Sequence, residues 1–249
     1  AGAALRDCGP ARRPIHWRRT GTHTTREADG VLNSGENAAL HILVFCTGRI
    51  DRPRSGGELR VRHLCEELAR RGHRVDVEAL VARNHPAVEV WPVDGLRIRL
   101  RHALWLDLAL LADRTGLVPA TELPVWLAPM AGWAGRRMRR GGYDLVHFEM
   151  PWFAAWQGYV PRGTRTVYSA QNIEWVWWRG RLLSRRGGAM WRRRLFVHET
   201  HAIERADAAV GCAAFDCRWL LRCRRRLHEG RDAVELIANG YDARRIRPP

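Results

Sequence analysis

The sequence predicts an α/β fold built on a doubly wound parallel sheet, with helices covering both faces of the sheet. Apolar runs typical of buried strands alternate along the chain with segments that carry the apolar periodicity of helices. The first strand run, residues 42–46, is continuously apolar, as in parallel strands that are buried on both faces. With 249 residues and 46% hydrophobic composition, the chain can bury the core that this fold needs.

The unit that organises the chain is a strand, a loop and a helix within residues 41–75. Residues 42–46 predict a strand, and a loop rich in Pro, Gly and Ser follows it. The helix after this loop is expected to end near Gly72, a residue type typical of a left-handed C-cap. Its buried face is predicted from the i, i+3, i+4, i+7 spacing of Val61, Leu64, Cys65 and Leu68.

Gly56 and Gly57 fall at the first turn of this predicted helix. Backbone N–H groups there have no helical partner and lie at the positive end of the helix dipole. A glycine pair at such a place lets a phosphate or a sugar hydroxyl approach the backbone closely. The alternative is a glycine turn that only packs the helix against the strand.

Strand and helix patterns continue to alternate through the rest of the chain. Strands are predicted at residues 74–80, 95–100, 143–149, 164–170, 206–213 and 233–238. Helices are predicted within residues 102–140, where prolines interrupt the pattern, and at 189–205 and 215–227. Residues 1–38 have few large apolar side chains and predict a disordered or poorly ordered basic tail, so the folded domain is expected at 39–238.

Polar side chains follow two consecutive predicted strands at the point where each strand ends. The candidates are His147, Glu149, Gln171, Asn172 and Glu174. Ligands of open α/β sheets gather at the carboxyl ends of the strands. We therefore expect Gly57, Glu149, Gln171 and Asn172 to line one cleft. For His147 the alternative is a buried, hydrogen-bonded histidine.

The composition is strongly basic, with a formal net charge of +16. All 42 residues counted as Lys or Arg are Arg, which points first to coding bias in a GC-rich genome. The charge still favours anionic partners such as phosphorylated ligands, anionic lipid surfaces or nucleic acid. The Trp-bearing helical faces within residues 102–140 either cover the sheet or contact an anionic membrane. Trp and Arg are interleaved within residues 175–194, where they could stack on bases or sugars or lie at a membrane interface.

Neither metal binding nor membrane spanning is expected. The six cysteines form no C-x-x-C pair, and His198 and His201 are three residues apart rather than the four of a zinc-binding H-E-x-x-H motif. No stretch reaches the roughly 18 apolar residues that a spanning helix needs. The expected location is cytoplasmic, with peripheral contact at the inner face of the plasma membrane as a further expectation.

Several motifs, taken in order, resemble the N-terminal domain of GT-B glycosyltransferases of family 4, the glycosyl transferases group 1 superfamily. The resemblance begins at His41 and continues to the last residue. Its most specific pair is ERADAAV followed by IANGYD. The motifs are SGGELR (55–60), LARRGHRVDV (68–77), YDLVHFE (143–149), SAQNIEW (169–175), ETHAIERADAAVGCAAFD (199–216) and VELIANGYDARRIRP (234–248).

The resemblance implies two Rossmann-like domains that face a cleft. The N-terminal domain would bind the acceptor and the C-terminal domain the nucleotide-sugar donor, in a metal-independent and usually retaining transfer. Residues 239–249 look like the start of the hinge between the domains, so the chain is expected to be only the acceptor half and to be inactive alone. The implied acceptor is a glycan or a polyprenyl-linked or lipid molecule, and no cofactor is expected in this chain.

Residue roles follow from the same resemblance. Gly56 and Gly57 match the family's glycine loop, and Arg60 would face the same cleft. Gln171 stands where many members place a histidine, and Glu149 where other members show a second histidine. These two residues are the catalytic candidates, but glutamine cannot exchange a proton at neutral pH, which makes general acid or base chemistry at Gln171 doubtful.

Two other functions remain open at this point. A dinucleotide-binding oxidoreductase has a similar fold, but the loop after the first strand lacks G-x-G-x-x-G, and Glu78 is the only candidate for binding a ribose. A nucleic-acid-binding protein would fit the charge and the Trp content. No recognised nucleic-acid-binding module is present, however, and no specific nucleic acid is expected as a partner.

Overall fold

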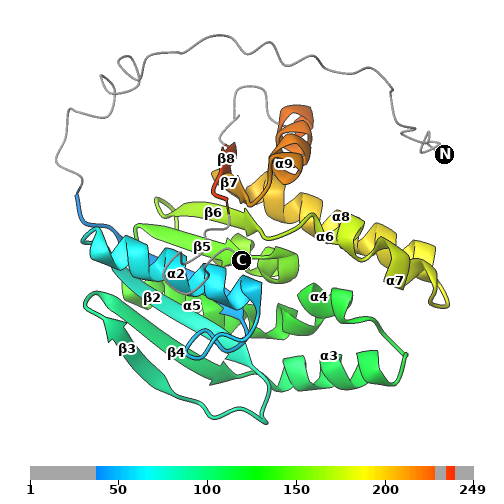
Figure 1. Cartoon of the computed structure of the whole chain (residues 1–249), viewed down its shortest axis with the longest axis horizontal. Coiled ribbons are helices and arrows are strands. Elements are labelled where there is room, and N and C mark those ends of the chain that lie inside the picture. The colour runs from blue at the N-terminus through cyan, green and yellow to red at the C-terminus, as the bar shows by residue number, and fades with distance from the viewer. Residues whose placement is uncertain (1–37, 228–233, 239–249) are drawn as a thin grey trace, which may run out of the picture. The chain divides into compact units, whose positions relative to one another are not determined.

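One mixed sheet runs through the computed structural model, which describes residues 38–227 and 234–238. The strands within these residues lie in the order β3-β4-β2-β1-β5-β6-β7-β8 (Figure 1). Their bounds are β1 His41–Thr47, β2 Arg74–Val81, β3 Glu89–Val93, β4 Leu96–His102, β5 Leu145–Glu149, β6 Arg165–Ala170, β7 Ala208–Gly211 and β8 Val234–Leu236. Residues 1–37 of the predicted tail (1–38) and the whole predicted hinge (239–249) lie outside the described residues.

All strand pairs are parallel except the pair of β3 with β4 at the edge of the sheet. The predicted fold class, a doubly wound α/β sheet, is therefore confirmed. Strand β3 was missed because Pro92 argues against a strand, and proline is tolerated only at an edge position such as this one. The limits proposed for a folded domain at 39–238 stay a prediction.

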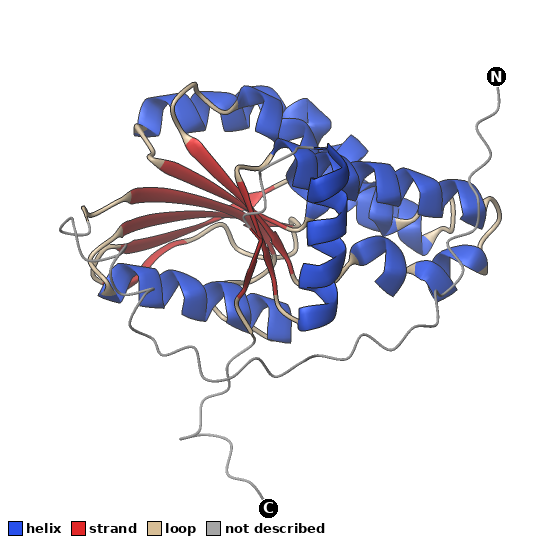
Figure 2. Ribbon diagram, turned by 90° about the horizontal axis from the view of Figure 1, so that it is seen from above, coloured by secondary structure: helices blue, strands red, loops and turns tan. Residues whose placement is uncertain are grey.

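Helices lie on both faces of the sheet, as seen along the view of Figure 2. The α-helices are α2 Gly56–Arg70, α3 Leu104–Arg114, α4 Leu123–Leu127, α5 Ala131–Gly141, α6 Glu174–Trp177, α7 Arg179–Leu183, α8 Gly188–Arg205 and α9 Ala214–Leu227. Short 3-10 helices are η1 Ala120–Glu122, η2 Ala128–Met130 and η3 Pro151–Tyr159. Helix α2 ends as predicted, with Gly72 in the left-handed region at φ 89°.

Alternate residues of β1 serve two different cores. Ile42, Val44 and Cys46 pack with Val61 and Cys65 of α2. Leu43 and Phe45 point to the other face, into a cluster with α3, α4, α5, η3 and α8. Strand β1 is buried on both faces because helices cover both, as its apolar run predicted.

Aromatic side chains fill the second core around Phe45. The ring centroid of Phe45 lies 5.1 Å from that of Trp156 and 5.8 Å from that of Phe148. Trp156 is fully buried, and its indole Nε1 donates to the carbonyl of Leu127 at 2.9 Å. Other residues of the Trp-bearing segments also pack here, namely Trp105, Trp126, Met130, Trp133, Trp175, Trp178 and Trp191. Covering the sheet is therefore the role of these seven side chains.

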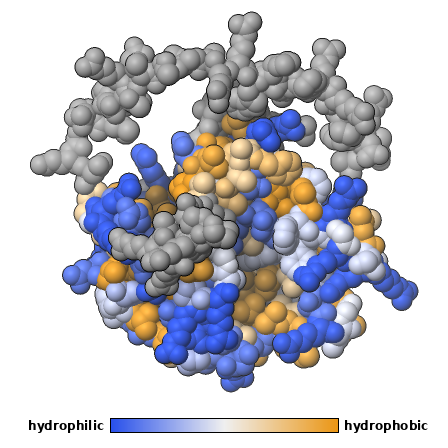
Figure 3. Space-filling view, viewed as in Figure 1, coloured by the Kyte–Doolittle hydropathy of each residue, from blue (hydrophilic) through white to orange (hydrophobic). Residues whose placement is uncertain are grey.

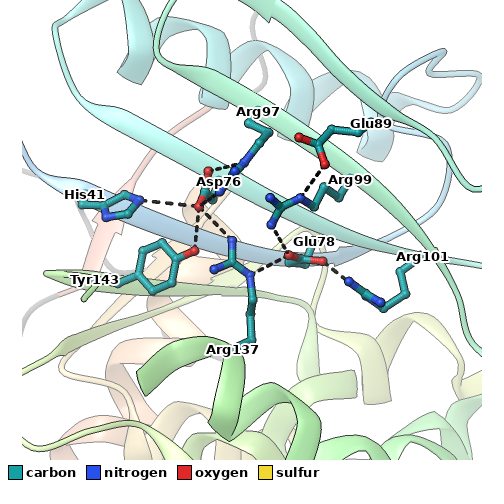
Figure 4. A network of polar contacts seen from close by, with 9 residues as sticks. All are labelled: His41, Asp76, Glu78, Glu89, Arg97, Arg99, Arg101, Arg137 and Tyr143. Atoms are coloured by element: carbon teal, nitrogen blue, oxygen red, sulfur yellow. Dashed lines mark hydrogen bonds and ion pairs between the residues drawn. The ribbon is translucent and has the colours of Figure 1, made fainter. Parts of the chain in front are cut away.

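A buried ionic network fastens α5 to the sheet on the face opposite α2 (Figure 4). Arg137 of α5 donates from Nη2 to Asp76 at 2.8 Å and from Nε to Glu78 at 2.7 Å. Burial disfavours the Asp76 carboxylate, but hydrogen bonds from Arg97, Tyr143 and Arg137 outweigh burial and hold its pKa below the usual range. The remaining members of the network are His41, Glu89, Arg99 and Arg101.

Replacing Trp156 with alanine should cost about 3–5 kcal/mol of the free energy of unfolding. The change empties a large buried volume and leaves the Leu127 carbonyl without its donor. Trp177→Ala is the matched control, because the Trp177 side chain is 68% exposed and should matter by less than about 0.5 kcal/mol. Urea unfolding measures both variants, and equal losses would contradict the assignment of Trp156 to the core.

Candidate functional site

A cavity of about 200 Å³ opens at the carboxyl edge of the sheet, between the start of α2 and the ends of β1, β5 and β6. The structure brings three predicted site residues together here, Gly57, Glu149 and Gln171. The other lining residues are Thr47, Gly48, Ser55, Glu58, Val61 and Met150. The two polar strand ends and the glycine of the first helix therefore share one cavity, although what they bind stays a prediction.

The start of α2 is shaped by a capping box that the sequence analysis overlooked. Ser55 accepts from the backbone N–H of Glu58 at 3.2 Å, and the Glu58 carboxylate accepts from the N–H of Ser55 at 3.1 Å. The same carboxylate accepts from the N–H groups of Arg49 and Arg54, at 2.9 and 2.7 Å. Glu58 thereby holds the loop after β1, and the S-x-x-E spacing was the signal that could have revealed it.

Burial raises the pKa of Glu58, whereas these backbone hydrogen bonds lower it. The hydrogen bonds outweigh burial, so the pKa lies below the usual range. The carboxylate is also the reason for a glycine at position 48. Gly48 has φ 98°, and a Cβ there would overlap the Glu58 side-chain oxygen. The loop conformation thus depends on Gly48 and Glu58 together.

Gly57 matters because Gln171 lies directly against it. A Cβ at position 57 would overlap the Gln171 side-chain oxygen, whereas a Cβ at Gly56 would meet nothing within 4 Å. The Gln171 amide Nε2 donates to Glu149 at 3.0 Å and to the carbonyl of Gly57 at 3.4 Å. Close packing explains the glycine at 57 but not the one at 56.

Glu149 is the central charged group of the cavity. It is only 2% exposed, and its second oxygen lies 2.8 Å from His147 Nε2. Burial opposes ionisation, but His147 and the Gln171 amide outweigh burial, so the pKa of Glu149 is lowered. His147 is itself buried and contacts Glu149 without lining the cavity, so it is the buried, hydrogen-bonded histidine of the alternative left open by the sequence.

Met150 adds a strained backbone at the same place. Its φ of 73° is the only positive φ of a non-glycine residue in the described part of the chain. Such strain costs free energy and clusters at functional sites. The residue follows Glu149 directly and lines the cavity.

Five of the predicted site residues do not line this cavity, namely Gly56, Arg60, His147, Asn172 and Glu174. Arg60 is buried and donates from Nη1 to the carbonyl of Ile237 at 2.7 Å, just beyond β8. Asn172 follows Gln171 but is not part of the lining. Glu174 is buried and accepts from the indole of Trp178 at 2.9 Å. Arg60 and Glu174 instead contact Ile237 and Trp178, which are not part of the lining.

Glu174 lies beside a second buried carboxylate that the sequence analysis missed. Glu199 of α8 accepts from the N–H groups of Glu174 and Trp175, at 3.0 and 3.3 Å, and so holds the start of α6. Burial raises the pKa of Glu199 to about 8 although these N–H groups favour its ionised form. Burial also raises the pKa of Glu174 to about 7.

The cavity offers the chemistry of a hydroxyl-binding site. The ionised Glu149 accepts hydrogen bonds, Gln171 can both donate and accept, and the first turn of α2 presents backbone N–H groups. Within the described residues, no group of three His, Cys, Asp or Glu side chains could hold a metal ion. No helix among them is long and apolar enough to cross a membrane.

The sequence pattern that defines Glycosyltransferase Family 4 matches residues 54–245. The chain belongs to this family. The matched residues include the cavity-lining Gly57, Glu149 and Gln171. A comparison with the curated proteins gives no match to this sequence.

Solved GT-B glycosyltransferases share the fold of this family 4 chain. Sucrose-phosphate synthase from Thermosynechococcus elongatus has a TM-score of 0.60 at 16% identity, over 84% of this chain and 51% of that one. The catalytic domain of starch synthase IV from Arabidopsis thaliana has a TM-score of 0.52 at 12% sequence identity, and the match covers 83% of this chain and 53% of that one. UGT2 from Phytolacca americana has a TM-score of 0.51 at 9% sequence identity, and the match covers 82% of this chain and 55% of that one. The chain thus spans about half the length of these structures.

Gly57→Ala should expel the Gln171 side chain from its hydrogen bond with Glu149. The lost bond to a charged group outweighs the gain in helix propensity, so the free energy of unfolding should fall by about 1 kcal/mol. Gly56→Ala is the control and should be neutral or stabilising by up to about 1 kcal/mol, because its Cβ meets nothing. Urea unfolding decides, and a stability gain in both variants would contradict the packing described.

The buried Glu199 should make stability fall as the pH rises. An unfolded glutamate loses its proton near pH 4.5 and the folded Glu199 near pH 8, so the folded state binds more protons between these values. We expect the free energy of unfolding to decrease from pH 5.5 to 8.5, with Glu199→Gln removing much of the decrease.

Urea unfolding at a series of pH values tests this expectation. Glu67→Gln on the exposed side of α2 makes the same change of side chain and should keep the wild-type slope. A wild-type slope in Glu199→Gln would show that the Glu199 carboxylate does not carry the effect.

Proposed function

We propose that this chain is the acceptor-binding half of a glycosyltransferase that moves a sugar from a nucleotide-sugar donor to a glycan or lipid-linked acceptor. The single observation that carries the proposal is the cavity in which Gly57, Glu149 and Gln171 meet at the carboxyl edge of the sheet. Membership of Glycosyltransferase Family 4 supports the reaction class. The donor would be held by a second domain, and the transfer would be retaining.

In this proposal Glu149 and Gln171 orient the acceptor rather than move its proton. The lowered pKa of Glu149 makes its carboxylate a weak base, and an amide does not titrate at neutral pH. Their carbonyl and carboxylate oxygens can accept hydrogen bonds from acceptor hydroxyls. Orientation of this kind lowers the barrier by holding the reacting atoms in line.

A lipid-linked acceptor is supported by the surface of the segment from α6 to α8. Trp177, Leu183 and Met190 expose about half or more of their surface there. Exposed arginines, among them Arg179 and Arg186, occur on the same segment. Apolar side chains accompanied by arginine bind anionic lipid surfaces.

The two other functions receive less support. The loop between β1 and α2 is occupied by the Glu58 carboxylate and lacks the glycine pattern of dinucleotide-binding loops. Several arginines that could contact nucleic acid, such as Arg97, Arg99 and Arg137, are ion-paired with buried carboxylates. Neither alternative explains the polar cavity.

Nucleoside diphosphate release from a panel of nucleotide sugars, measured on the full-length protein with and without acceptors, tests the proposal. Gln171→Ala should lower kcat/KM for the acceptor by about tenfold or more, because an acceptor hydrogen bond is lost. Asn84→Ala removes an exposed amide away from the cavity and should leave kcat/KM unchanged. The 249-residue chain alone should transfer no sugar; turnover by it, or full activity of Gln171→Ala, would overturn the proposal.

A further inference from the structure

The loop between β6 and α6 carries Gln171 into the candidate site. The Gln171 side chain donates to Glu149 and to the carbonyl of Gly57. The carbonyl of Gln171 accepts from Cys212 Sγ at 2.7 Å. Only two residues separate Gln171 from Glu174, the first residue of α6. The place of Gln171 in the cavity therefore depends on how the start of α6 is held.

Helix α6 has no capping side chain of its own. Its N-cap residue is Ile173, whose side chain cannot accept a hydrogen bond. The first N–H groups of a helix find no partner within the helix. Glu199 of α8 supplies the missing acceptors: the N–H of Glu174 donates to Oε1 at 3.0 Å, and the N–H of Trp175 donates to Oε2 at 3.3 Å. A carboxylate from a distant helix thus takes the place of a local cap.

Ile173 ties the loop to α6. Its side chain is 2% exposed and belongs to the core cluster beside β6 that includes Tyr168, Ala170 and Leu220. A side chain packed in this way leaves the two-residue link little freedom of its own. A change in how Glu199 holds α6 is therefore passed to Gln171 rather than absorbed by the link.

The ionisation state of Glu199 decides how many N–H groups it can hold. A carboxylate accepts through both oxygens, whereas a protonated carboxyl group must donate through one of them. Both oxygens of Glu199 face backbone N–H donors, so a proton on either oxygen displaces a hydrogen bond. The Tyr168 hydroxyl, 3.2 Å from Oε1, also favours the ionised form. Only the ionised Glu199 holds the start of α6 through both bonds.

The surroundings of Glu199 are rich in acids. Glu199 is fully buried and forms no ion pair with a cation in the described part of the chain. Glu174 of α6 and Asp216 of α9 are also buried, and each raises the pKa of an acidic neighbour. In Figure 3, hydrophobic side chains gather over β8 and the start of α9, the helix that carries Asp216. Burial and, to a smaller extent, repulsion from Glu174 raise the pKa of Glu199 to about 8.

Other charged groups on the elements packed against α8 are engaged elsewhere, and η3 carries none. They are Glu122 of η1 with Arg194, Arg181 of α7 with the Trp178 ring, and Arg224 of α9 with the carbonyls of Ile203 and Ala206, while Arg179 of α7 is exposed. Glu174 and Tyr168 are thus the titratable groups that bear directly on Glu199.

We propose that Glu199 is a positioning residue for the acceptor site: its carboxylate fixes the start of α6 and thereby the place of Gln171 against Glu149. The inference rests on the proposed function, in which Gln171 orients the acceptor. Glu199 itself lies outside the cavity and acts only through the loop. Loss of its proton adds a hydrogen bond to α6, so acceptor recognition strengthens as the pH rises.

Opposite pH trends separate this role from a merely structural one. Ionising the buried Glu199 costs stability, so the free energy of unfolding falls as the pH rises. A structural role alone would make activity follow stability downward. The positioning role instead predicts that kcat/KM for the acceptor rises severalfold from about pH 6 to about pH 9, because one backbone hydrogen bond is gained.

Steady-state kinetics of the full-length protein across this pH range test the inference. Glu199→Gln should abolish the rise and keep kcat/KM near its low-pH value, because the amide offers one acceptor oxygen and turns its NH2 group toward a backbone N–H. Glu67→Gln, the same change on the exposed side of α2, should keep the wild-type rise. An equal rise in both variants would overturn the inference.

Tyr168→Phe tests the inference even if Glu199→Gln does not fold. This variant keeps the carboxylate and nearly the whole volume of the buried ring. The lost hydroxyl favoured the ionised form of Glu199, so the midpoint of the pH profile should move to higher pH while the size of the rise is kept. An unchanged midpoint, or one at lower pH, would contradict the assignment of the rise to Glu199.

Nuclear magnetic resonance of the 249-residue chain makes the test independent of sugar transfer. The backbone amides of Glu174 and Trp175 and the side-chain amide of Gln171 should shift with one common midpoint near pH 8. The common movement should vanish in Glu199→Gln. If it persists there, Glu174 or another group causes it and the inference is wrong.

The two measurements together distinguish this inference from the proposed function. If the full-length protein transfers no sugar but the Gln171 amide follows the titration of Glu199, the function fails and the positioning role stands. If Gln171→Ala impairs transfer but the Gln171 amide does not follow Glu199, the function stands and the positioning role fails.

Discussion

The parallel pairing of β1 with β5 is the constraint on which the candidate site depends. Val44 pairs with His147 and Phe45 with Phe148, although about a hundred residues separate them in the chain. From β1 the chain proceeds outward through β2 and β4, and from β5 it proceeds to the other side through β6 and β7. The strand order reverses between β1 and β5, and such reversals leave a crevice at the carboxyl ends of the strands. The loop after β1, which Glu58 holds, and the Glu149 carboxylate at the end of β5 meet in this crevice because β1 and β5 are neighbours.

The half-buried Glu58 and the buried Glu149 and Glu199, rather than surface charges, keep this crevice in shape. Glu58, Glu149 and Glu199 each bind a separate loop: the loop after β1, the Gln171 side chain after β6, and the start of α6. The hydrogen-bond donors outweigh burial at Glu58 and Glu149, whose pKa values are lowered, but not at Glu199, where burial raises the pKa to about 8. Removing a donor from a buried acceptor costs more than the bond itself contributes. The crevice is therefore held open by interactions that would be expensive to lose, which is the preorganisation that a binding site requires.

The sequence was sufficient for most of the fold and for part of the site. The apolar run of β1 predicted a strand buried on both faces, the alternation of Leu96, Ile98 and Leu100 predicted β4, and apolar-rich segments predicted β2, β5, β6, β7 and β8. The edge strand β3 was not predicted, since one side of an edge strand faces water and Pro92 interrupts the apolar pattern typical of a strand. Position at the strand ends brought Gly57, Glu149 and Gln171 together correctly, but no periodicity could reveal that Arg60 would turn to the Ile237 carbonyl or that Glu199 would lie against Glu174. Contacts between segments so distant in the chain depend on side-chain packing, which the local pattern does not encode.

Ion pairs with buried carboxylates limit what the high arginine content indicates about ligands. Arg97, Arg99, Arg101 and Arg137 neutralise Asp76 and Glu78 within the sheet, so part of the net charge of +16 is offset where acidic groups are buried. Arginines without such a partner keep a charge that an anionic ligand could contact. The surroundings of each arginine, more than the number of arginines, therefore decide whether its charge is available to a ligand.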